Sequence, residues 1–257
     1  MPASEATLSL ALDRPASAPA RAVASEAPHP LRVYYDDLYR ALGPQHWWPG
    51  RTPFEIIVGA ILTQNTAWSN VERAIANLRK ARLLTPAALQ RVPAPRLARL
   101  IRSSGYFRQK AKKLKSFVRF LRREYGGSLA RMFRVPTPRL REQLLAVHGI
   151  GPETADSILL YAGRHRSFVV DAYTRRILER HGHSHSRETY DQIRARFEDA
   201  LPRDTALYNE YHALIVITGK NWCRTKNPLC SLCPLAPHLP EGAPLPVEPV
   251  AAGARPS

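Results

Sequence analysis

Apolar residues recur along most of the chain at intervals of three and four residues, the spacing of a helix with one buried face. No stretch shows the sustained apolar–polar alternation of a half-buried strand. We therefore expect an all-α fold. The spacing predicts short helices within 83–101 and longer ones over 31–42, 54–62, 68–78, 108–123, 140–147, 152–162, 174–180, 190–201 and 208–217.

Two of these predicted helices, 140–147 and 152–162, are separated by Gly149-Ile150-Gly151 and together predict a helix–hairpin–helix. Pro152 suits the first position of the second helix, because its missing N–H would be unpaired there. Two glycines let the backbone approach a phosphate and direct N–H groups at it, with the positive end of the second helix behind them. The same residues also fit an ordinary corner between two helices of a core.

The residues after the hairpin favour a binding site over a simple corner. Phe168-Val169-Val170 is an apolar run that ends in the carboxylate of Asp171, and Arg175 and Arg176 follow. A carboxylate at that place, flanked by cations, is a candidate for chemistry beside a bound polyanion.

The charge balance also indicates a polyanionic partner. The 257 residues carry a formal net charge of +17, which favours nucleic acid, although a ribosomal or membrane-surface protein would share it. No apolar run is long enough to span a bilayer, and no basic start with an apolar stretch marks a secretory signal. We expect a monomer in the cytoplasm, associated with the nucleoid.

Three segments are expected to be solvated. Residues 1–29 and 240–257 are rich in Ala and Pro and cannot bury much apolar surface, so they are predicted to be disordered tails. His181, His183 and His185 alternate in a polar stretch without a carboxylate partner. We interpret them as a solvated loop and not as a metal site.

Aromatic and amide side chains stand at two breaks between predicted helices. Trp47, Trp48 and Pro49 lie between the first two helices, where aromatic planes could stack on a base removed from a duplex or could cap the core. Gln64 and Asn65 follow the second helix. Their side chains could reach outward to DNA or could serve the turn.

Basic residues are concentrated on the predicted helix 108–123, opposite its apolar face. Most of them are expected to form a solvated face. Arg108 and Lys110 lie nearest the preceding turn and are the better candidates for phosphate contacts.

Leu-x-x-x-x-Gly-Ile-Gly-x-x-x-Ala followed by Val-Val-Asp resembles the helix–hairpin–helix DNA glycosylases of the endonuclease III superfamily. The resemblance implies that Asp171 is the catalytic carboxylate. Endonuclease III carries a Schiff-base lysine two residues after the second hairpin glycine, where this chain has Glu153. Since a carboxylate cannot form an imine, a glycosylase without lyase activity is implied.

Several motifs resemble the 3-methyladenine DNA glycosylase III branch of that superfamily, over roughly residues 31–222. They are the Trp47-Trp48-Pro49 segment and residues 59–66, 104–111 and 149–156, with glutamate again in place of the lysine. In that branch the Trp-Trp-Pro segment stacks on an alkylated purine, and a lysine, here Lys220, lies near the pocket.

The superfamily resemblance has further implications for the DNA interface and the lobes. A glutamine, here Gln64 beside Asn65, fills the gap left by the flipped nucleotide. Residues 30–53 with 168–222 form one lobe and 54–167 the other, with a cleft between them. The hairpin contacts DNA through His148, Gly149, Ile150, Gly151, Glu153 and Thr154.

Three cysteines match the first three ligands of the endonuclease III iron–sulfur loop, with the spacing Cys223-x6-Cys230-x2-Cys233. Thiolates so spaced hold a [4Fe–4S] cluster. Leu239 stands where the fourth cysteine should be, and His238 beside it is the candidate fourth ligand. Zinc bound by three cysteines and a histidine, or an empty loop, are alternatives. A metal ion at the hairpin is a further expectation.

The expected function is a monofunctional DNA N-glycosylase acting on double-stranded DNA with a damaged base, an N-alkylated purine such as 3-methyladenine. One alternative is a glycosylase/lyase for oxidised pyrimidines that uses a displaced lysine such as Lys220. Another is a DNA-binding module without catalysis.

Overall fold

The computed structural model describes residues 28–47 and 50–247, and every regular element in them is helical, as predicted. None of the described helices is long and apolar enough to cross a bilayer. The α-helices are α1 (Pro30–Leu42), α2 (Pro53–Leu62), α3 (Trp68–Lys80), α4 (Pro86–Arg91), α5 (Ala94–Leu100), α6 (Phe107–Tyr125), α7 (Leu129–Met132), α8 (Thr137–Leu145), α9 (Pro152–Ser157), α10 (Ala172–Arg180), α11 (Tyr190–Ala200) and α12 (Thr205–Asn221).

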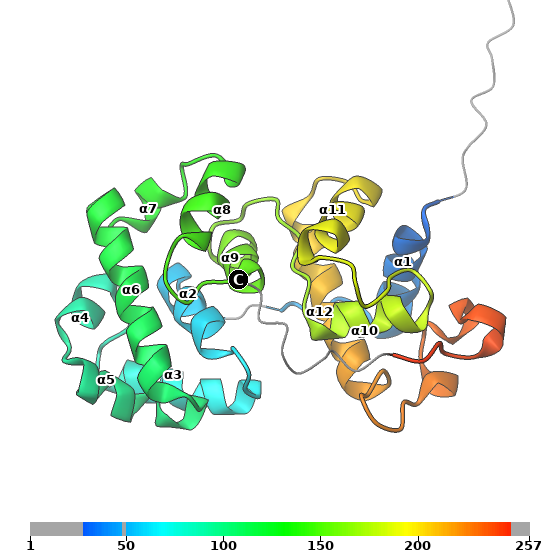
Figure 1. Cartoon of the computed structure of the whole chain (residues 1–257), viewed down its shortest axis with the longest axis horizontal. Helices are drawn as coiled ribbons and strands as arrows, with labels where there is room; N and C mark the ends of the chain where they lie inside the picture. The colour runs from blue at the N-terminus through cyan, green and yellow to red at the C-terminus, as the bar shows by residue number, and fades with distance from the viewer. Residues whose placement is uncertain (1–27, 48–49, 248–257) are drawn as a thin grey trace, which may run out of the picture.

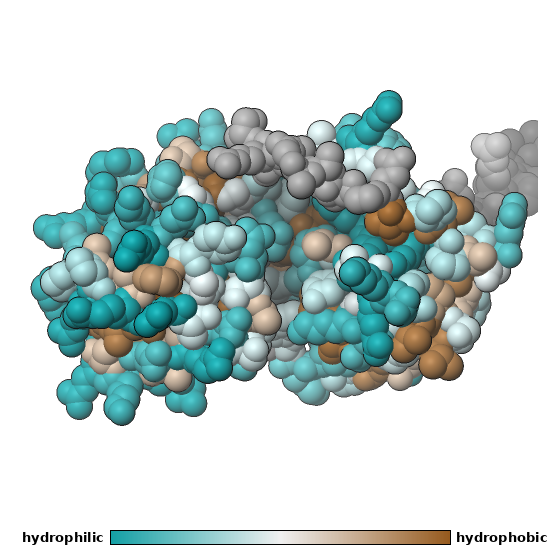
Figure 2. Space-filling view, turned by 60° about the horizontal axis from the view of Figure 1, so that its bottom comes forward, coloured by the Kyte–Doolittle hydropathy of each residue, from teal (hydrophilic) through white to brown (hydrophobic). Residues whose placement is uncertain are grey.

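These helices form two lobes that lie side by side (Figure 1). One lobe contains α2 to α9. The other contains α1 together with α10, α11 and α12, and so combines both ends of the described chain. The surface between the lobes is hollowed (Figure 2).

The apolar helix α2 lies inside the hairpin lobe and packs against α3, α6 and α9. Thr52 caps its start by accepting a hydrogen bond from the Glu55 N–H, and Pro53 follows at the first position, where a missing N–H costs nothing. Its apolar side chains are almost completely buried on all sides, which fixes the loop with Gln64 at its end. They are Phe54, Ile56, Ile57, Val58, Ile61 and Leu62.

The predicted helix over 152–162 is interrupted in the structure. It consists of α9 followed by a π-helical turn, η2 (Ile158–Ala162). This turn packs against α2 in one lobe and α12 in the other. Single π turns are rare and occur often at functional sites.

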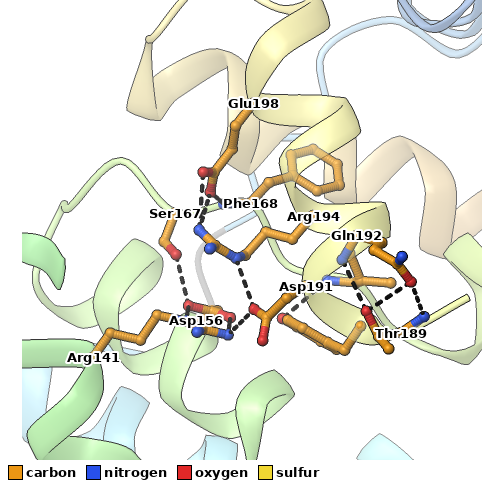
Figure 3. Close-up of polar contacts among 11 residues, drawn as sticks. Arg141, Asp156, Ser167, Phe168, Thr189, Asp191, Gln192, Arg194 and Glu198 are labelled. Carbon is orange, nitrogen blue, oxygen red and sulfur yellow. Dashed lines mark hydrogen bonds and ion pairs between the residues drawn. The ribbon is translucent and has the colours of Figure 1, made fainter.

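A network of ion pairs holds the segment between η2 and α10 against α11 (Figure 3). Arg141 of α8 binds the buried Asp156 of α9 at 2.9 Å and Asp191 of α11 at 2.7 Å. The Ser167 hydroxyl donates to Asp156, and the Phe168 N–H donates to Glu198 of α11. The approach to Asp171 is therefore fixed to both lobes.

Past α12, the described chain forms three 3-10 turns, η3 (Cys230–Leu232), η4 (Ala236–His238) and η5 (Pro240–Gly242). The tail predicted to be disordered over 240–257 is placed too early in the sequence. Leu245 within it donates its N–H to the Arg180 carbonyl at 3.0 Å. Residues 1–27 and 248–257 lie outside the described part of the chain.

Candidate DNA-binding and catalytic site

The hairpin requires glycine at its first position. Gly149 has φ +85°, and a Cβ there would lie 2.3 Å from Cγ of Lys113. The Ile150 side chain is buried, so it anchors the turn and leaves only backbone for a ligand. Gly151 caps α9 in an extended conformation and is exposed. The hairpin thus presents backbone N–H groups at the start of a helix.

Gln64 is bound to the hairpin in this structure. Its Nε2 donates to the Gly149 carbonyl at 3.0 Å and to the Thr154 hydroxyl at 2.9 Å, and its Oε1 accepts a hydrogen bond from Lys113. Thr154 is buried. Asn65 is exposed and has a left-handed backbone, φ 53°. The α2 loop and the hairpin therefore form one surface, with Asn65 projecting from it.

The two basic residues predicted to bind phosphate have different environments. Arg108 is exposed at the start of α6, with its guanidinium over the Phe107 ring. Lys110 is only 2% exposed, and its ammonium donates to the carbonyls of Leu62 and Ser104. The expectation for Lys110 is wrong, because its buried ammonium links the end of α2 to the 3-10 turn η1 (Arg102–Ser104). His148 is exposed beside the hairpin, as a DNA contact requires.

Asp171 lies at the start of α10 and uses only one carboxylate oxygen for the fold. Its Oδ1 accepts from the Thr174 N–H at 2.8 Å and from the Thr174 hydroxyl at 2.9 Å. Its Oδ2 lies 3.6 Å from Nε2 of His212, and the side chain is 13% exposed. Burial acts to raise the pKa of Asp171, but His212 and the Thr174 bonds outweigh it and lower the pKa below its ordinary value. The carboxylate is thus ionised with one oxygen available.

Two residues of this site were missed by the sequence analysis, His212 of α12 and Tyr161 of η2. The Tyr161 hydroxyl is hydrogen-bonded to Nδ1 of His212, and both side chains are buried. Burial raises the pKa of Tyr161 far above its ordinary range. A histidine in an otherwise apolar helical stretch was the signal that could have been noticed.

Glu153 stands beside Asp171 at the position of the family's lysine. Its side chain keeps contact with solvent. The surrounding protein nevertheless displaces water from the carboxyl group, and this desolvation, together with the negative charge of Asp171, raises the pKa of Glu153 to about 7. The charges of His212 and Arg175 act in the opposite direction. Near neutral pH the site therefore holds an ionised Asp171 and a Glu153 side chain that gains or loses its proton.

The proposed base pocket is described in part. The Trp47 ring centroid lies 5.9 Å from that of His212, and the Asn209 amide donates to the Trp47 carbonyl at 3.4 Å. Trp48 and Pro49 lie outside the described residues. Lys220 is exposed in the last turn of α12, about 12 Å along the axis from His212. Its ammonium makes no hydrogen bond or ion pair with another described residue.

The three cysteines line one enclosed cavity together with Ile177, Arg180, His181, Thr218, Trp222, Leu235, Ala236 and Leu239. Arg180 donates a hydrogen bond to Sγ of Cys223 at 3.1 Å. Three soft donors of the kind that hold an iron–sulfur cluster thus line one cavity. In this structure they are nevertheless not arranged to hold a metal ion, and neither is any other group of three His, Cys, Asp or Glu side chains among the described residues, the hairpin included.

The expected fourth ligand, His238, does not face that cavity. Its Nε2 is 2.6 Å from Oδ2 of Asp37, and its ring lies against Tyr34. The expectation of a solvated histidine loop is also wrong for two of its members. His181 and His183 are hydrogen-bonded to the Tyr34 hydroxyl at 2.9 and 3.0 Å, which joins this segment to α1. His185 is exposed.

Sequence comparison finds relatives that share most of the chain. A family profile described as "HhH-GPD superfamily base excision DNA repair protein" matches residues 58–203. A protein of Methanocaldococcus jannaschii named "Putative DNA repair glycosylase MJ1434" is 47% identical over 203 residues, 78% of this chain and 91% of that protein. Endonuclease III of Thermotoga maritima is 32% identical over 186 residues, 72% of this chain and 82% of that protein.

Solved structures show the same architecture. A structure of endonuclease III in a non-covalent DNA complex has a TM-score of 0.71 at 23% identity, covering 82% of this chain and 94% of that chain. The H. pylori 3-methyladenine DNA glycosylase (MagIII) bound to 1,N6-ethenoadenine has a TM-score of 0.62 at 30% identity, covering 74% of this chain and 95% of that chain.

The fold is therefore the all-helical endonuclease III-like fold, and the predicted fold class is confirmed. The chain belongs to the HhH-GPD superfamily and is a base excision repair DNA glycosylase of that superfamily.

Proposed function

We propose that this glycosylase is monofunctional and removes an N-alkylated purine, such as 3-methyladenine, by hydrolysis of the N-glycosidic bond. The observation that carries the proposal is an ionised Asp171 with a free Oδ2, next to Glu153 at the place of the lyase lysine. The likeness to a 3-methyladenine DNA glycosylase with a modified adenine bound supports this substrate class.

The bound partner is double-stranded DNA, held through phosphates regardless of sequence. The hairpin N–H groups and Arg108 contact the backbone. Asn65 and Gln64 face the gap left by the flipped nucleotide, and Gln64 must then release its bonds to the hairpin. Trp47 stacks on the extruded base, with Trp48 and Pro49 assigned to the same pocket by resemblance.

The chemistry required of the protein is modest. Alkylation at a ring nitrogen makes the purine cationic, so the base is already a good leaving group and is attracted to aromatic faces. As the glycosidic bond breaks, positive charge develops on the sugar. The Asp171 carboxylate stabilises that charge where it appears and accepts the proton of the water that attacks C1′.

The test is a panel of alkylated, oxidised and mismatched duplexes, each assayed with and without alkaline cleavage. We expect release of an alkylated purine without strand nicking. Asp171→Asn, which keeps the cap on Thr174, should abolish release and keep DNA binding. No release from any duplex would instead favour a DNA-binding module without catalysis.

The second candidate is a bifunctional glycosylase/lyase for oxidised pyrimidines. The 32% identity to endonuclease III of Thermotoga maritima favours it, and Lys220 is the candidate amine. Borohydride would then trap a covalent adduct with DNA, and Lys220→Ala would abolish the adduct. Absence of an adduct from a protein that releases base excludes this reading.

We further propose that Cys223, Cys230 and Cys233 hold an iron–sulfur cluster through three thiolates. When bound, the cluster would close the segment after α12 into a rigid loop, in which Arg224 and Lys226 are exposed and available to phosphate. The protein is proposed to act as a monomer.

A further inference from the structure

One buried polar atom at the site has no hydrogen-bond partner. The imidazole of His212 is 6% exposed, yet its Nε2 makes no hydrogen bond within the described structure. The neighbouring acceptor is Oδ2 of Asp171 at 3.6 Å, which is too long for a direct hydrogen bond. Leaving a buried donor or acceptor unpaired costs about 1–3 kcal/mol, so the arrangement calls for a further group that contacts both atoms from one side.

The hydrogen-bond requirements of Tyr161 assign the proton on the imidazole. The Tyr161 hydroxyl is buried, and His212 Nδ1 is the acceptor that the described structure offers it. When the ring is neutral, the hydroxyl therefore donates to Nδ1, and the ring proton lies on Nε2. In the opposite tautomer the proton would be on Nδ1, so the Tyr161 hydroxyl would have no acceptor there. The lone pair of Nε2 would then face the Asp171 carboxylate.

We propose that His212 is a second catalytic residue, which holds the attacking water beside the pair of atoms formed by its Nε2–H and Oδ2 of Asp171. The proposal rests on the glycosylase function proposed above. A separation of 3.6 Å allows one water to contact both atoms. The water accepts a hydrogen bond from Nε2–H and donates one to Oδ2, so a lone pair is left to face C1′.

The proton and electron balance needs no additional reactant. The water oxygen forms a bond to C1′, and the glycosidic electron pair leaves with the purine, neutralising its positive charge. The proton of the water goes to Oδ2 of Asp171 and later to solvent. His212 keeps its proton throughout, and Tyr161 keeps its own.

Nitrogen NMR of the free protein tests the tautomer without any substrate. The chain has nine histidines, and the His212 signals are identified by their loss in His212→Asn. We expect a protonated Nε2 and an unprotonated Nδ1, with the Nε2 resonance shifted in Asp171→Asn. A proton on Nδ1 would overturn the proposal.

Single-turnover base release tests the catalytic role. Glutamine can place an N–H near the position of Nε2, whereas leucine cannot, so His212→Gln should stay within about tenfold of wild type while His212→Leu loses about 100-fold. Affinity for a duplex with an abasic-site analogue should be equal in both variants. A leucine variant as fast as wild type, or a loss that glutamine does not restore in folded protein, refutes the role. If wild type itself releases no base, the proposed function fails, and the NMR result still decides the tautomer.

Discussion

At the residue scale, one charge at the site should control how the protein responds to pH. The pKa of Glu153 is raised to about 7, above its ordinary value, so the folded state holds this proton more tightly than the unfolded state does. Stability is therefore lost as pH rises from the ordinary glutamate pKa toward 7.

Glu153→Gln removes the titrating carboxyl group, and with it the loss of stability at high pH. We expect the variant to unfold at a higher temperature than wild type at pH 8 and at nearly the same temperature at pH 4. Thermal unfolding at the two pH values measures this difference, with the exposed Glu142→Gln as the control. An equal effect of Glu153→Gln at both pH values would contradict the expectation.

Two neighbouring basic residues on α6 should respond to substitution in opposite ways. Arg108→Ala should weaken duplex binding and reduce the dependence of log affinity on log salt by about one, because it removes one phosphate contact. Lys110→Met should leave that slope unchanged. It should lower stability by about 1–3 kcal/mol, because the carbonyls of Leu62 and Ser104 lose their donor.

Salt titrations of binding and urea unfolding of both variants separate the two roles. If Lys110→Met changed the salt slope and kept full stability, the buried position of Lys110 in the structure would be contradicted.

At the element scale, the arrangement of the hairpin and Asp171 depends on the pair between α8 and α9. Asp156 is completely buried and Arg141 is 13% exposed, so removal of one partner leaves an uncompensated charge, a loss of about 3–5 kcal/mol. We expect Asp156→Asn to unfold at a much lower urea concentration than Asp191→Asn, whose carboxylate is 57% exposed. Similar urea midpoints for the two variants would show that the buried Arg141–Asp156 pair does not stabilise α8 and α9 in this way.

The sequence predicted the elements better than it predicted contacts between them. Periodicity located the helices, and the two glycines located the hairpin, because these signals are local. The direction of Lys110 was not predictable, since a basic helix face does not reveal which lysine folds back onto carbonyls. The Tyr161–His212 pair depends on a π turn and on 51 residues of separation, and neither leaves a local pattern.

At the scale of the whole molecule, the segment after α12 joins the two ends of the described chain. His238 of this segment pairs with Asp37 of α1. His181 and His183, which follow α10, contact Tyr34 of the same helix α1. The cysteine spacing suggested a fourth ligand nearby, but the α1 contacts that hold His238 come from residues about 200 positions earlier and could not be read from spacing.

The cluster proposal predicts an optical signal that depends on thiolates alone. Protein purified without oxygen should absorb broadly in the violet and blue and should contain iron and acid-labile sulfide. Cys233→Ser should remove the absorption, whereas His238→Ala should retain it and only lower thermal stability. Loss of the absorption in His238→Ala would contradict the assignment of three thiolates.

The most direct test of the central claim is the single-turnover release of 3-methyladenine from a methylated duplex by wild type and by Asp171→Asn. The geometry predicts release by wild type with an intact strand, and none by the variant, at equal affinity for the duplex. Release by Asp171→Asn at the wild-type rate would contradict the role assigned to this carboxylate.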